Sequence, residues 1–365
     1  MTTKKPYTLL SLLLAIGLVV AACSSNNNNN KSSGTTTSTS SSGSSVDYSS
    51  LSGSIKGSGS SFTDAFMQAA IAAFGSKAGG LNVTYNATGS GQGKKDFGSN
   101  LVDFAGTDSL VKAGDGPAAG SFLYVPTVAA PITISYNLPS VSDLKLSADT
   151  LGGLFSGTIK KWNDPAVAAD NPGVTLPSTN VVIAHRADGS GTTSNFTKYL
   201  TKAAPTTWKL GAGDTVAWPA DSQAGQKNPG VAQIVKATAG AIGYVDLADA
   251  EAAKLVFASI KNADGTFVKP TIDGAVAALA GATVNADVTY DPLNAAGAAA
   301  YPITSPTYVL VRTTYANQQT LNNVKGFLTF LLTDGQSLAK GNSYAKLPDA
   351  LRQKAIAQLT QIKVG

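Results

Sequence analysis

The sequence is poor in the residues that build disulfides and metal sites. Its 365 residues include one cysteine, Cys23, and one histidine, His185. A single cysteine excludes a disulfide framework, and one cysteine with one histidine cannot supply a structural zinc site. A serine hydrolase could draw only on that one histidine as its base. We therefore expect no metal ion and no cofactor.

Charge is also scarce and shows no concentration of one sign. Charged residues make up 13% of the chain, about half the usual quarter. The three arginines, Arg186, Arg312 and Arg352, are far apart in the sequence. Without an arginine-rich face, nucleic acid is not an expected partner. Hydrophobic residues reach 43%, which is enough for one large or two medium domains and excludes wholesale disorder.

The N-terminus has the order of a secretory signal. Lys4 and Lys5 precede an apolar run from Tyr7 to Val20, and the small residues Ala21 and Ala22 lead to Cys23. The run is shorter than the ~18 to 20 residues that cross a bilayer comfortably, so residues 1–22 are interpreted as a signal peptide. The residues before Cys23 resemble a bacterial lipobox, in which the cysteine thiol carries diacylglycerol. We expect lipidation of Cys23.

A tether follows this cysteine. From Ser24 to about Ser50 nearly every residue is Ser, Asn, Thr or Gly. Such a segment cannot bury enough apolar surface to offset the entropy of ordering it. Residues 23–50 are therefore predicted to be a disordered, lipid-anchored tether, and the folded body is expected to start near Leu51.

The folded body begins with alternating strands and helices. Segments 51–55, 83–85 and 102–105 are typical of strands, and helical spacing begins at Phe62 and again after Gly93. This βαβαβ pattern predicts an α/β fold with a mainly parallel sheet, whose ligand sites lie at the carboxyl ends of the strands.

Two β-rich runs, 124–136 and 302–311, divide the rest of the body. Helices are predicted at 148–155, 194–201, 318–332 and 348–362, with a strand at 181–184. We interpret the β-rich runs as two crossings between lobes. Lobe I would comprise residues 51–126 and 302–365, lobe II would comprise residues 127–301, and a ligand cleft would lie between them.

Three turns rich in glycine, serine and threonine each follow a strand and precede a helix: residues 57–61, 89–93 and 186–193. Helix N-termini present unpaired N–H groups and a partial positive charge, and glycine lets the backbone approach closely. The hydroxyls of Ser61, Ser90, Ser190 and Thr192 can add donors. Three such turns, one of which carries Arg186, predict a site for an oxyanion.

Other phosphate and hydrolase motifs are absent. A P-loop that includes Gly93 and Lys94 would need glycine at position 88 and serine or threonine at position 95, but the chain has Thr88 and Lys95. No turn has the full Rossmann spacing of glycines. Asp188 stands where a nucleophile elbow around Ser190 needs glycine. Two alternatives to phosphate capture remain open on the residues alone: a phosphate-ester hydrolase, and a binder of another oxyanion such as sulfate.

These turns resemble those of the periplasmic or lipoprotein phosphate-binding proteins that feed the high-affinity phosphate ABC transporter. The resemblance runs from about residue 54 to the C-terminus, and the Arg186–Thr192 run is its most specific part. The matching segments are Gly57–Phe62, Gly89–Ser90, Val102–Asp108, Ile159–Asp164, Arg186–Thr192, Gly240–Val245 and Tyr301–Ser305.

The resemblance implies a two-lobe binding protein that is not an enzyme. Its partners would be inorganic phosphate and a membrane permease, and it would work as a monomer outside the cytoplasm, in a periplasm or on a cell surface. The phosphate ligands it implies are Ser61, Phe62, Ser90, Asp108, Arg186, Ser190, Gly191 and Thr192. Asp188 would support Arg186 through an ion pair.

The first testable prediction concerns Cys23. In Cys23→Ala the protein should lose its lipid, so it should leave the membrane fraction or remain unprocessed. After labelling with a radioactive fatty acid and fractionation, the label should be found on the wild type and not on Cys23→Ala. Equal membrane retention of both proteins would contradict the lipidation of Cys23.

Overall fold

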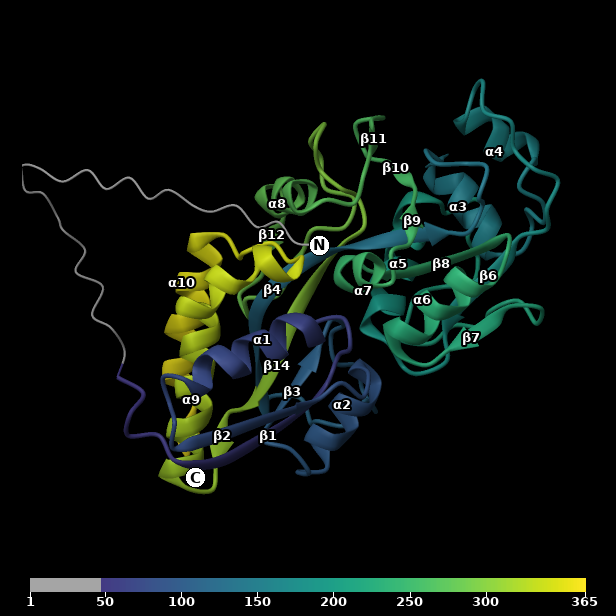
Figure 1. Ribbon diagram of the computed structural model, residues 1–365. Helices are drawn as coiled ribbons and strands as arrows, with labels where there is room; N and C mark the ends of the chain where they lie inside the picture. The colour runs from purple at the N-terminus through teal and green to yellow at the C-terminus, as the bar shows by residue number, and fades with distance from the viewer. Residues whose placement is uncertain (1–46) are drawn as a thin grey trace, which may run out of the picture. The chain divides into compact units, whose positions relative to one another are not determined.

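The computed structural model describes residues 47–365 (Figure 1). The predicted signal peptide, Cys23 and most of the predicted tether lie outside the described residues. Tyr48, which the sequence assigns to the tether, is buried, and its ring packs edge-on against Phe74 at 5.2 Å between centroids. The packed body thus begins before Leu51, because the Tyr48 ring packs in the hydrophobic core.

The first part of the sheet is the predicted βαβαβ unit. Strand β1 (Gly53–Gly59) lies between β2 (Leu81–Asn86) and β3 (Phe104–Thr107), and both pairings are parallel. Helices α1 (Asp64–Gly75) and α2 (Ser90–Gly98) connect them. The α/β prediction is confirmed, although α2 begins three residues earlier than Gly93, directly after Gly89.

The long strand β4 (Phe122–Tyr136) connects the two parts of the sheet. It pairs antiparallel with β14 (Thr304–Arg312) as far as Pro131, and with β8 (Ala241–Asp246) from Ile132 onward. The strand order is β2-β1-β3-β14-β4-β8-β6-β7. We call the part on the β14 side lobe I and the part on the β8 side lobe II. The predicted boundary between residues 126 and 127 lies inside β4, before its pairing partner changes.

Lobe II repeats the arrangement of strand, turn and helix. Strand β6 (Val182–Arg186) is parallel to both β8 and β7 (Gln223–Gly225). Helix α5 (Gly191–Ala203) follows β6, and α6 (Lys227–Ala237) follows β7. Helix α3 (Ala148–Phe155) has the predicted bounds, whereas α6 was not predicted.

The remaining elements complete the two lobes. They are β5 (Lys145–Leu146), α4 (Pro165–Asp170), α7 (Leu247–Ala252), β9 (Val256–Phe257), β10 (Ser259–Lys261), β11 (Phe267–Val268), α8 (Ile272–Ala280), β12 (Thr283–Val284), β13 (Tyr290–Asp291), β15 (Thr314–Tyr315), α9 (Gln318–Leu332), η1 (Asp334–Leu338), η2 (Lys340–Asn342), α10 (Asp349–Gln358), η3 (Leu359–Gln361) and β16 (Lys363–Val364). Helix α9 has the predicted bounds, and α10 with η3 covers most of the helix predicted at 348–362. Within residues 47–365, no helix is both long and apolar enough to cross a membrane.

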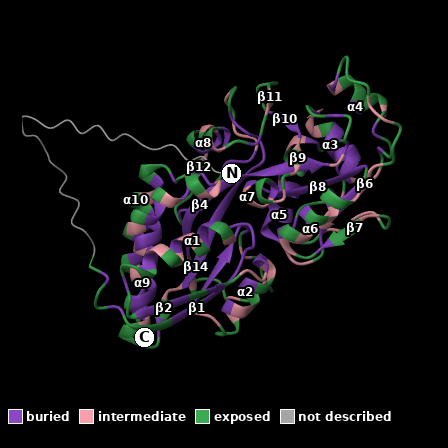
Figure 2. Cartoon of the chain, viewed as in Figure 1, coloured by how far each residue is buried: buried purple, intermediate pink, exposed green. Residues whose placement is uncertain are grey.

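Buried residues follow the strands and the inner faces of the helices, whereas residues on the outer helix faces are exposed (Figure 2). In lobe I the ring of Phe74 on α1 packs against Phe327 and Phe330 on α9, at 5.3 and 5.2 Å between centroids. In lobe II, Phe196 on α5 stacks on Tyr244 of β8 at 4.8 Å. These contacts pack α1 against α9 in lobe I and α5 against β8 in lobe II.

A close backbone approach brings the first turn to the end of β3. Gly59 has a φ of +139°, and a Cβ at this position would lie 2.1 Å from the carbonyl oxygen of Gly106. Only glycine tolerates both the dihedral angle and the contact. The turn after β1 therefore reaches the residues that follow β3.

Candidate functional site

The three predicted turns lie where parallel strands end and helices begin. Ser60 and Ser61 follow β1, Ser90 starts α2, and Arg186 ends β6 before the turn into α5. Within lobe I the carboxyl ends of the parallel strands β1 and β3 open toward the same edge of the sheet, where N–H groups of the following helices converge. Strand β6 runs antiparallel to β1 and β3, so its carboxyl end faces theirs from lobe II. The arrangement of the two lobes thus brings all three turns to one region.

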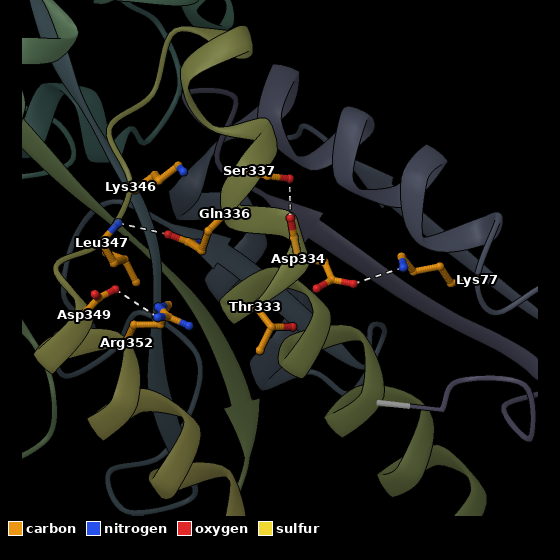
Figure 3. A pocket seen from close by; sticks show the side chains of 9 residues that line it. All are labelled: Lys77, Thr333, Asp334, Gln336, Ser337, Lys346, Leu347, Asp349 and Arg352. Atoms are coloured by element: carbon orange, nitrogen blue, oxygen red, sulfur yellow. Dashed lines mark hydrogen bonds and ion pairs between the residues drawn. The ribbon is translucent and has the colours of Figure 1, made fainter. Parts of the chain in front are cut away.

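A hollow of about 530 Å³ elsewhere in lobe I has a different character (Figure 3). It lies among Lys77, η1 and the start of α10. Lys77 pairs with Asp334 at 3.1 Å, and Arg352 pairs with Asp349 at 2.9 Å. These cations are already balanced by carboxylates on the surface, so we place the candidate site at the three turns.

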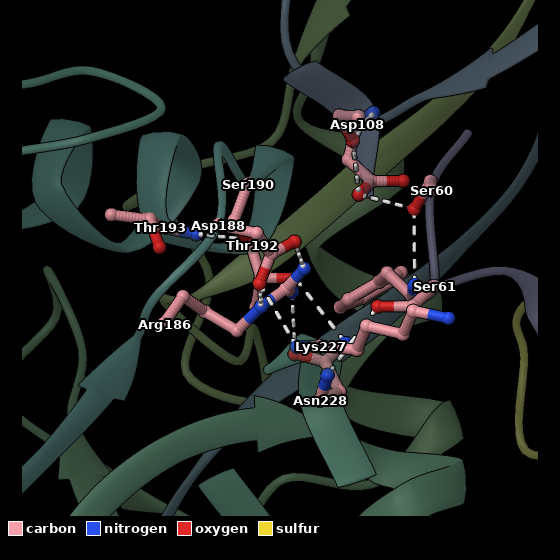
Figure 4. A network of polar contacts seen from close by, with 12 residues as sticks. Ser60, Ser61, Asp108, Arg186, Asp188, Ser190, Thr192, Thr193, Lys227 and Asn228 are labelled. Carbon is pink, nitrogen blue, oxygen red and sulfur yellow. Dashed lines mark hydrogen bonds and ion pairs between the residues drawn. The ribbon is translucent and has the colours of Figure 1, made fainter. Parts of the chain in front are cut away.

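The turns of lobe I contact those of lobe II directly. The N–H of Gly91 donates to the carbonyl of Gly189 at 2.9 Å. The N–H of Asn228, at the start of α6, donates to Ser61 Oγ at 3.3 Å. Figure 4 shows Asp108 beside Ser60, from lobe I, and Arg186 beside Asp188 and Asn228, from lobe II. The structure therefore brings the two sides of the predicted cleft together.

Arg186 is buried and its guanidinium is held on two sides. Its Nε donates to Asp188 Oδ1 at 2.9 Å, and its Nη2 pairs with Asp188 Oδ2. Its Nη1 donates to Asn228 Oδ1 at 3.0 Å and to Thr192 Oγ1 at 3.5 Å. Burial raises the pKa of Asp188, but the bonds from Arg186 outweigh it, so this pKa lies below its ordinary value. The pair with Asp188 fixes the orientation of the Arg186 guanidinium in the site and neutralises most of its charge.

The N-terminus of α5 supplies further donors. Ser190 Oγ accepts a hydrogen bond from the N–H of Thr193 at 3.1 Å and caps the helix. Among the described residues, nothing accepts a hydrogen bond from the N–H groups of Gly191 and Thr192. Thr192 Oγ1 lies 3.5 Å from Arg186 Nη1, so these helix N–H groups and a guanidinium share this corner of the site.

Gly191 lets α5 contact the end of β3. A Cβ at this position would lie 2.7 Å from Asp108 Oδ2 and 2.7 Å from Ser90 Oγ. Asn195, one turn further along α5, donates to the carbonyl of Asp108 at 2.6 Å. The start of the helix is thereby held against the Asp108 carboxyl.

Asp108 is 2% exposed and only half satisfied. Its Oδ2 accepts from Ser60 Oγ at 2.6 Å and from Ser90 Oγ at 3.3 Å. Its Oδ1 is buried without a hydrogen-bond partner among the described residues. Burial raises the pKa of Asp108 to about 7. A buried acceptor without a donor costs free energy unless a ligand supplies one.

The remaining residues named from the sequence are also in this region. Phe62 is buried, and its N–H donates to Ser60 Oγ at 3.0 Å. His185 packs differently: its ring stacks on Trp218 at 5.2 Å between centroids, and its Nδ1 is 2.9 Å from the carbonyl oxygen of Arg186. His185 thus supports the backbone next to Arg186.

Three polar residues of the site were not singled out from the sequence. Ser60 contacts Asp108, Asn228 contacts Arg186, and Asn195 contacts the backbone of Asp108. Ser60 adjoins the predicted Ser61 and could have been included with it. Asn228 carried no signal, because it precedes Pro229 and Gly230, which are typical of a loop rather than of a helix.

Comparison with known proteins agrees with this architecture. Residues 30–335 match a family model described as a PBP superfamily domain. The phosphate-binding protein PstS of Pasteurella multocida is 35% identical over 316 residues, which covers 85% of this chain and 91% of that protein. The chain belongs to the phosphate-binding protein PstS family. Another member, PstS 3 of Mycobacterium tuberculosis, is 35% identical over 315 residues, covering 82% and 84% of the two chains.

Solved structures extend the likeness to three dimensions. The structure of a high-affinity periplasmic phosphate-binding protein with bound phosphate matches with a TM-score of 0.68 at 25% identity, covering 84% of this chain and 94% of that one. A putative phosphate ABC transporter substrate-binding protein from Clostridium perfringens, solved with bound phosphate, shares the fold with a TM-score of 0.60 at 18% identity, covering 81% of this chain and 100% of that one. The α/β fold of a periplasmic binding protein, which was predicted from the sequence, is thus confirmed.

The second prediction concerns the pH dependence of stability. Asp108 keeps its proton up to about pH 7 in the folded protein, but loses it near 3.8 in the unfolded chain. The folded state therefore binds more protons between these values, and its stability falls as pH rises through them. Relative to Asp108→Asn, the free energy of unfolding of the wild type should decrease by about 1 to 3 kcal/mol between pH 5 and pH 8.

Denaturant unfolding in phosphate-free buffer at several pH values measures this difference. Asp273→Asn, which changes an exposed carboxylate of α8, serves as the control and should show no such trend. A difference between wild type and Asp108→Asn that stays constant with pH would contradict the raised pKa.

Proposed function

We propose that this chain captures inorganic phosphate outside the cytoplasm and delivers it to the membrane permease of an ABC-type importer. One observation carries the proposal: the Arg186 guanidinium and the N–H groups of Gly191 and Thr192 face the same site as Asp108 Oδ1, and within residues 47–365 neither those N–H groups nor that oxygen has a hydrogen-bond partner. This combination of donors with one buried acceptor suits an oxyanion that still carries a proton.

The proposed ligands come from both lobes. Ser61, Phe62, Ser90 and Asp108 would contact phosphate from lobe I. Arg186, Ser190, Gly191 and Thr192 would contact it from lobe II, with Asp188 supporting Arg186. Contacts from both sides would favour the closed arrangement, in which Asn228 already reaches Ser61.

Neutral dipoles would provide most of the stabilisation of the anion. The ion pair with Asp188 cancels much of the charge of Arg186, while its planar fork keeps its orientation. Helix N-termini bind anions through N–H groups without a mobile counter-charge. The site can therefore hold a doubly charged ligand without a large excess of buried positive charge.

We also propose that Asp108 selects phosphate over sulfate. Near neutral pH phosphate retains at least one proton, and a carboxylate can accept it, whereas sulfate offers only lone pairs. Sulfate would therefore leave Asp108 facing like charge in a site from which water is excluded. A site built around such a polar group rejects the ligand that cannot satisfy it.

A phosphate-ester hydrolase is the weaker candidate. Ser190 Oγ is engaged as the cap of α5, and the His185 ring lies on Trp218 with its Nδ1 against a backbone carbonyl. Nucleophilic catalysis needs a base within hydrogen-bond reach of the serine. We therefore propose a binder without turnover.

The cellular context follows from the N-terminal sequence. We propose that residues 1–22 are removed, that Cys23 carries lipid, and that residues 23–50 tether lobe I (51–126 and 302–365) and lobe II (127–301) to a bacterial membrane. The protein would act as a monomer, since each lobe contributes its own ligands to one cleft.

The third prediction tests the role of Arg186. Arg186→Ala should weaken phosphate binding by about 2 to 5 kcal/mol, because a buried charge-assisted contact is lost and Asp188 remains near the anion. Titration calorimetry of the lipid-free protein with phosphate measures this loss. Arg352→Ala, at an arginine paired with Asp349 in lobe I, is the matched control and should bind as wild type. Unchanged affinity in a folded Arg186→Ala variant would remove Arg186 from the site.

The fourth prediction tests the selectivity of Asp108. The wild type should prefer phosphate over sulfate by about a thousandfold or more, or roughly 4 kcal/mol. Asp108→Asn should narrow this gap, since an amide can donate to a fully deprotonated oxyanion. Competitive titration of both anions at fixed salt gives the ratio. An identical ratio in the two proteins would show that another residue selects the ligand.

A further inference from the structure

A second buried charge cluster lies behind the candidate site. Lys94, on α2, has a side chain that is 1% exposed. Its Nζ lies 2.5 Å from Asp115 Oδ2, 2.9 Å from Asp214 Oδ2 and 3.3 Å from Ser109 Oγ. An ammonium group this deeply buried needs opposite charge and hydrogen bonds to offset its desolvation. None of these four residues is among the proposed phosphate ligands.

The partners of Lys94 belong to different lobes. Ser109 directly follows Asp108, and Asp115 lies in the same connection between β3 and β4. Asp214 lies beyond α5, in lobe II. Lys94 therefore bridges the residues after β3 and a segment of the opposite lobe.

The segment around Asp214 is attached to the start of α5. The carbonyl of Asp214 accepts from the N–H of Ser190 at 3.0 Å, and the N–H of Gly213 donates to Thr197 Oγ1 at 3.2 Å. A pull on Asp214 is thus transmitted to Ser190, the residue that caps α5. Through Ser109, the same lysine is one residue from Asp108.

Resting on the proposed function, we infer that the ion pair between Lys94 and Asp214 is a positioning contact that holds the start of α5 against Asp108 in the closed protein and slows phosphate release. Asp115 makes this contact reversible. When the lobes separate, Lys94 loses Asp214 but keeps a carboxylate partner from its own lobe. Opening therefore breaks one buried ion pair without leaving the lysine unpaired.

The contact should act on release rather than on capture. It forms only after the lobes have met, so it stabilises the closed complex and not the encounter of phosphate with an open cleft. Interactions of this kind change the dissociation rate more than the association rate. If the pair had only a structural role, its removal would instead lower the stability of the phosphate-free protein.

The fifth prediction concerns Asp214→Asn. This variant should release phosphate about tenfold faster or more, with an association rate within about twofold of wild type. Its unfolding in the absence of phosphate should match that of wild type. Asp214→Glu, which keeps the charge, should recover part of the slow release. In a Lys94→Met background, Asp214→Asn should have no further effect on the release rate.

Release is measured by mixing protein loaded with radiolabelled phosphate with excess unlabelled phosphate. Asp221→Asn and Lys95→Met, at exposed neighbours in the sequence, are the matched controls and should release phosphate as wild type does. Binding by wild type with unchanged release from Asp214→Asn would overturn this inference alone. A loss of stability in phosphate-free Asp214→Asn equal to its loss of affinity would also overturn it. Failure of the wild type to bind phosphate would overturn the proposed function and this inference together.

Discussion

The contact between the start of α5 and the Asp108 carboxyl is the constraint on which the rest of the site depends. Gly191 allows it, because a side chain there would meet both Asp108 and Ser90. Asn195 reinforces it through the backbone of Asp108. Once these atoms touch, the N–H groups of α5, the guanidinium of Arg186 and a buried acceptor from the opposite lobe must lie within one small region.

Buried charges around this contact are balanced locally. Arg186 is paired with Asp188, and Lys94 is paired with Asp115 and Asp214. Unbalanced charge in a closed cleft would be costly, whereas paired groups keep their direction without a strong net field. The first pair orients donors at the proposed ligand, and the second joins segments of the two lobes behind it. Asp108 is the exception, since one of its oxygens has no partner among the described residues.

Much of the fold could be predicted because its signals are local. A strand-like segment predicted β1, alternating apolar residues predicted β2, helical spacing predicted α1, and glycine-rich turns marked the strand ends. Helices were also predicted at α3 and α9. The helix α6 was missed, and Asn228 with it, because Asn228, Pro229 and Gly230 in its first turn have the composition of a loop. From the sequence, the lobe boundary was predicted between residues 126 and 127. These two residues lie within β4, a continuous strand whose two ends pair with different neighbours.

The sequence by itself determined the α/β class, the positions of the three turns that we propose bind an oxyanion, and the residues that those turns carry. Each of these depends on neighbours a few positions apart, through periodicity, glycine conformation and helix capping. Only the tertiary structure decided which groups meet. Asp108 lost water and gained a raised pKa because α2 and α5 enclose it, and Lys94 became a bridge because carboxylates from two lobes reach it. Burial and pairing across distant segments depend on packing, which no local pattern records.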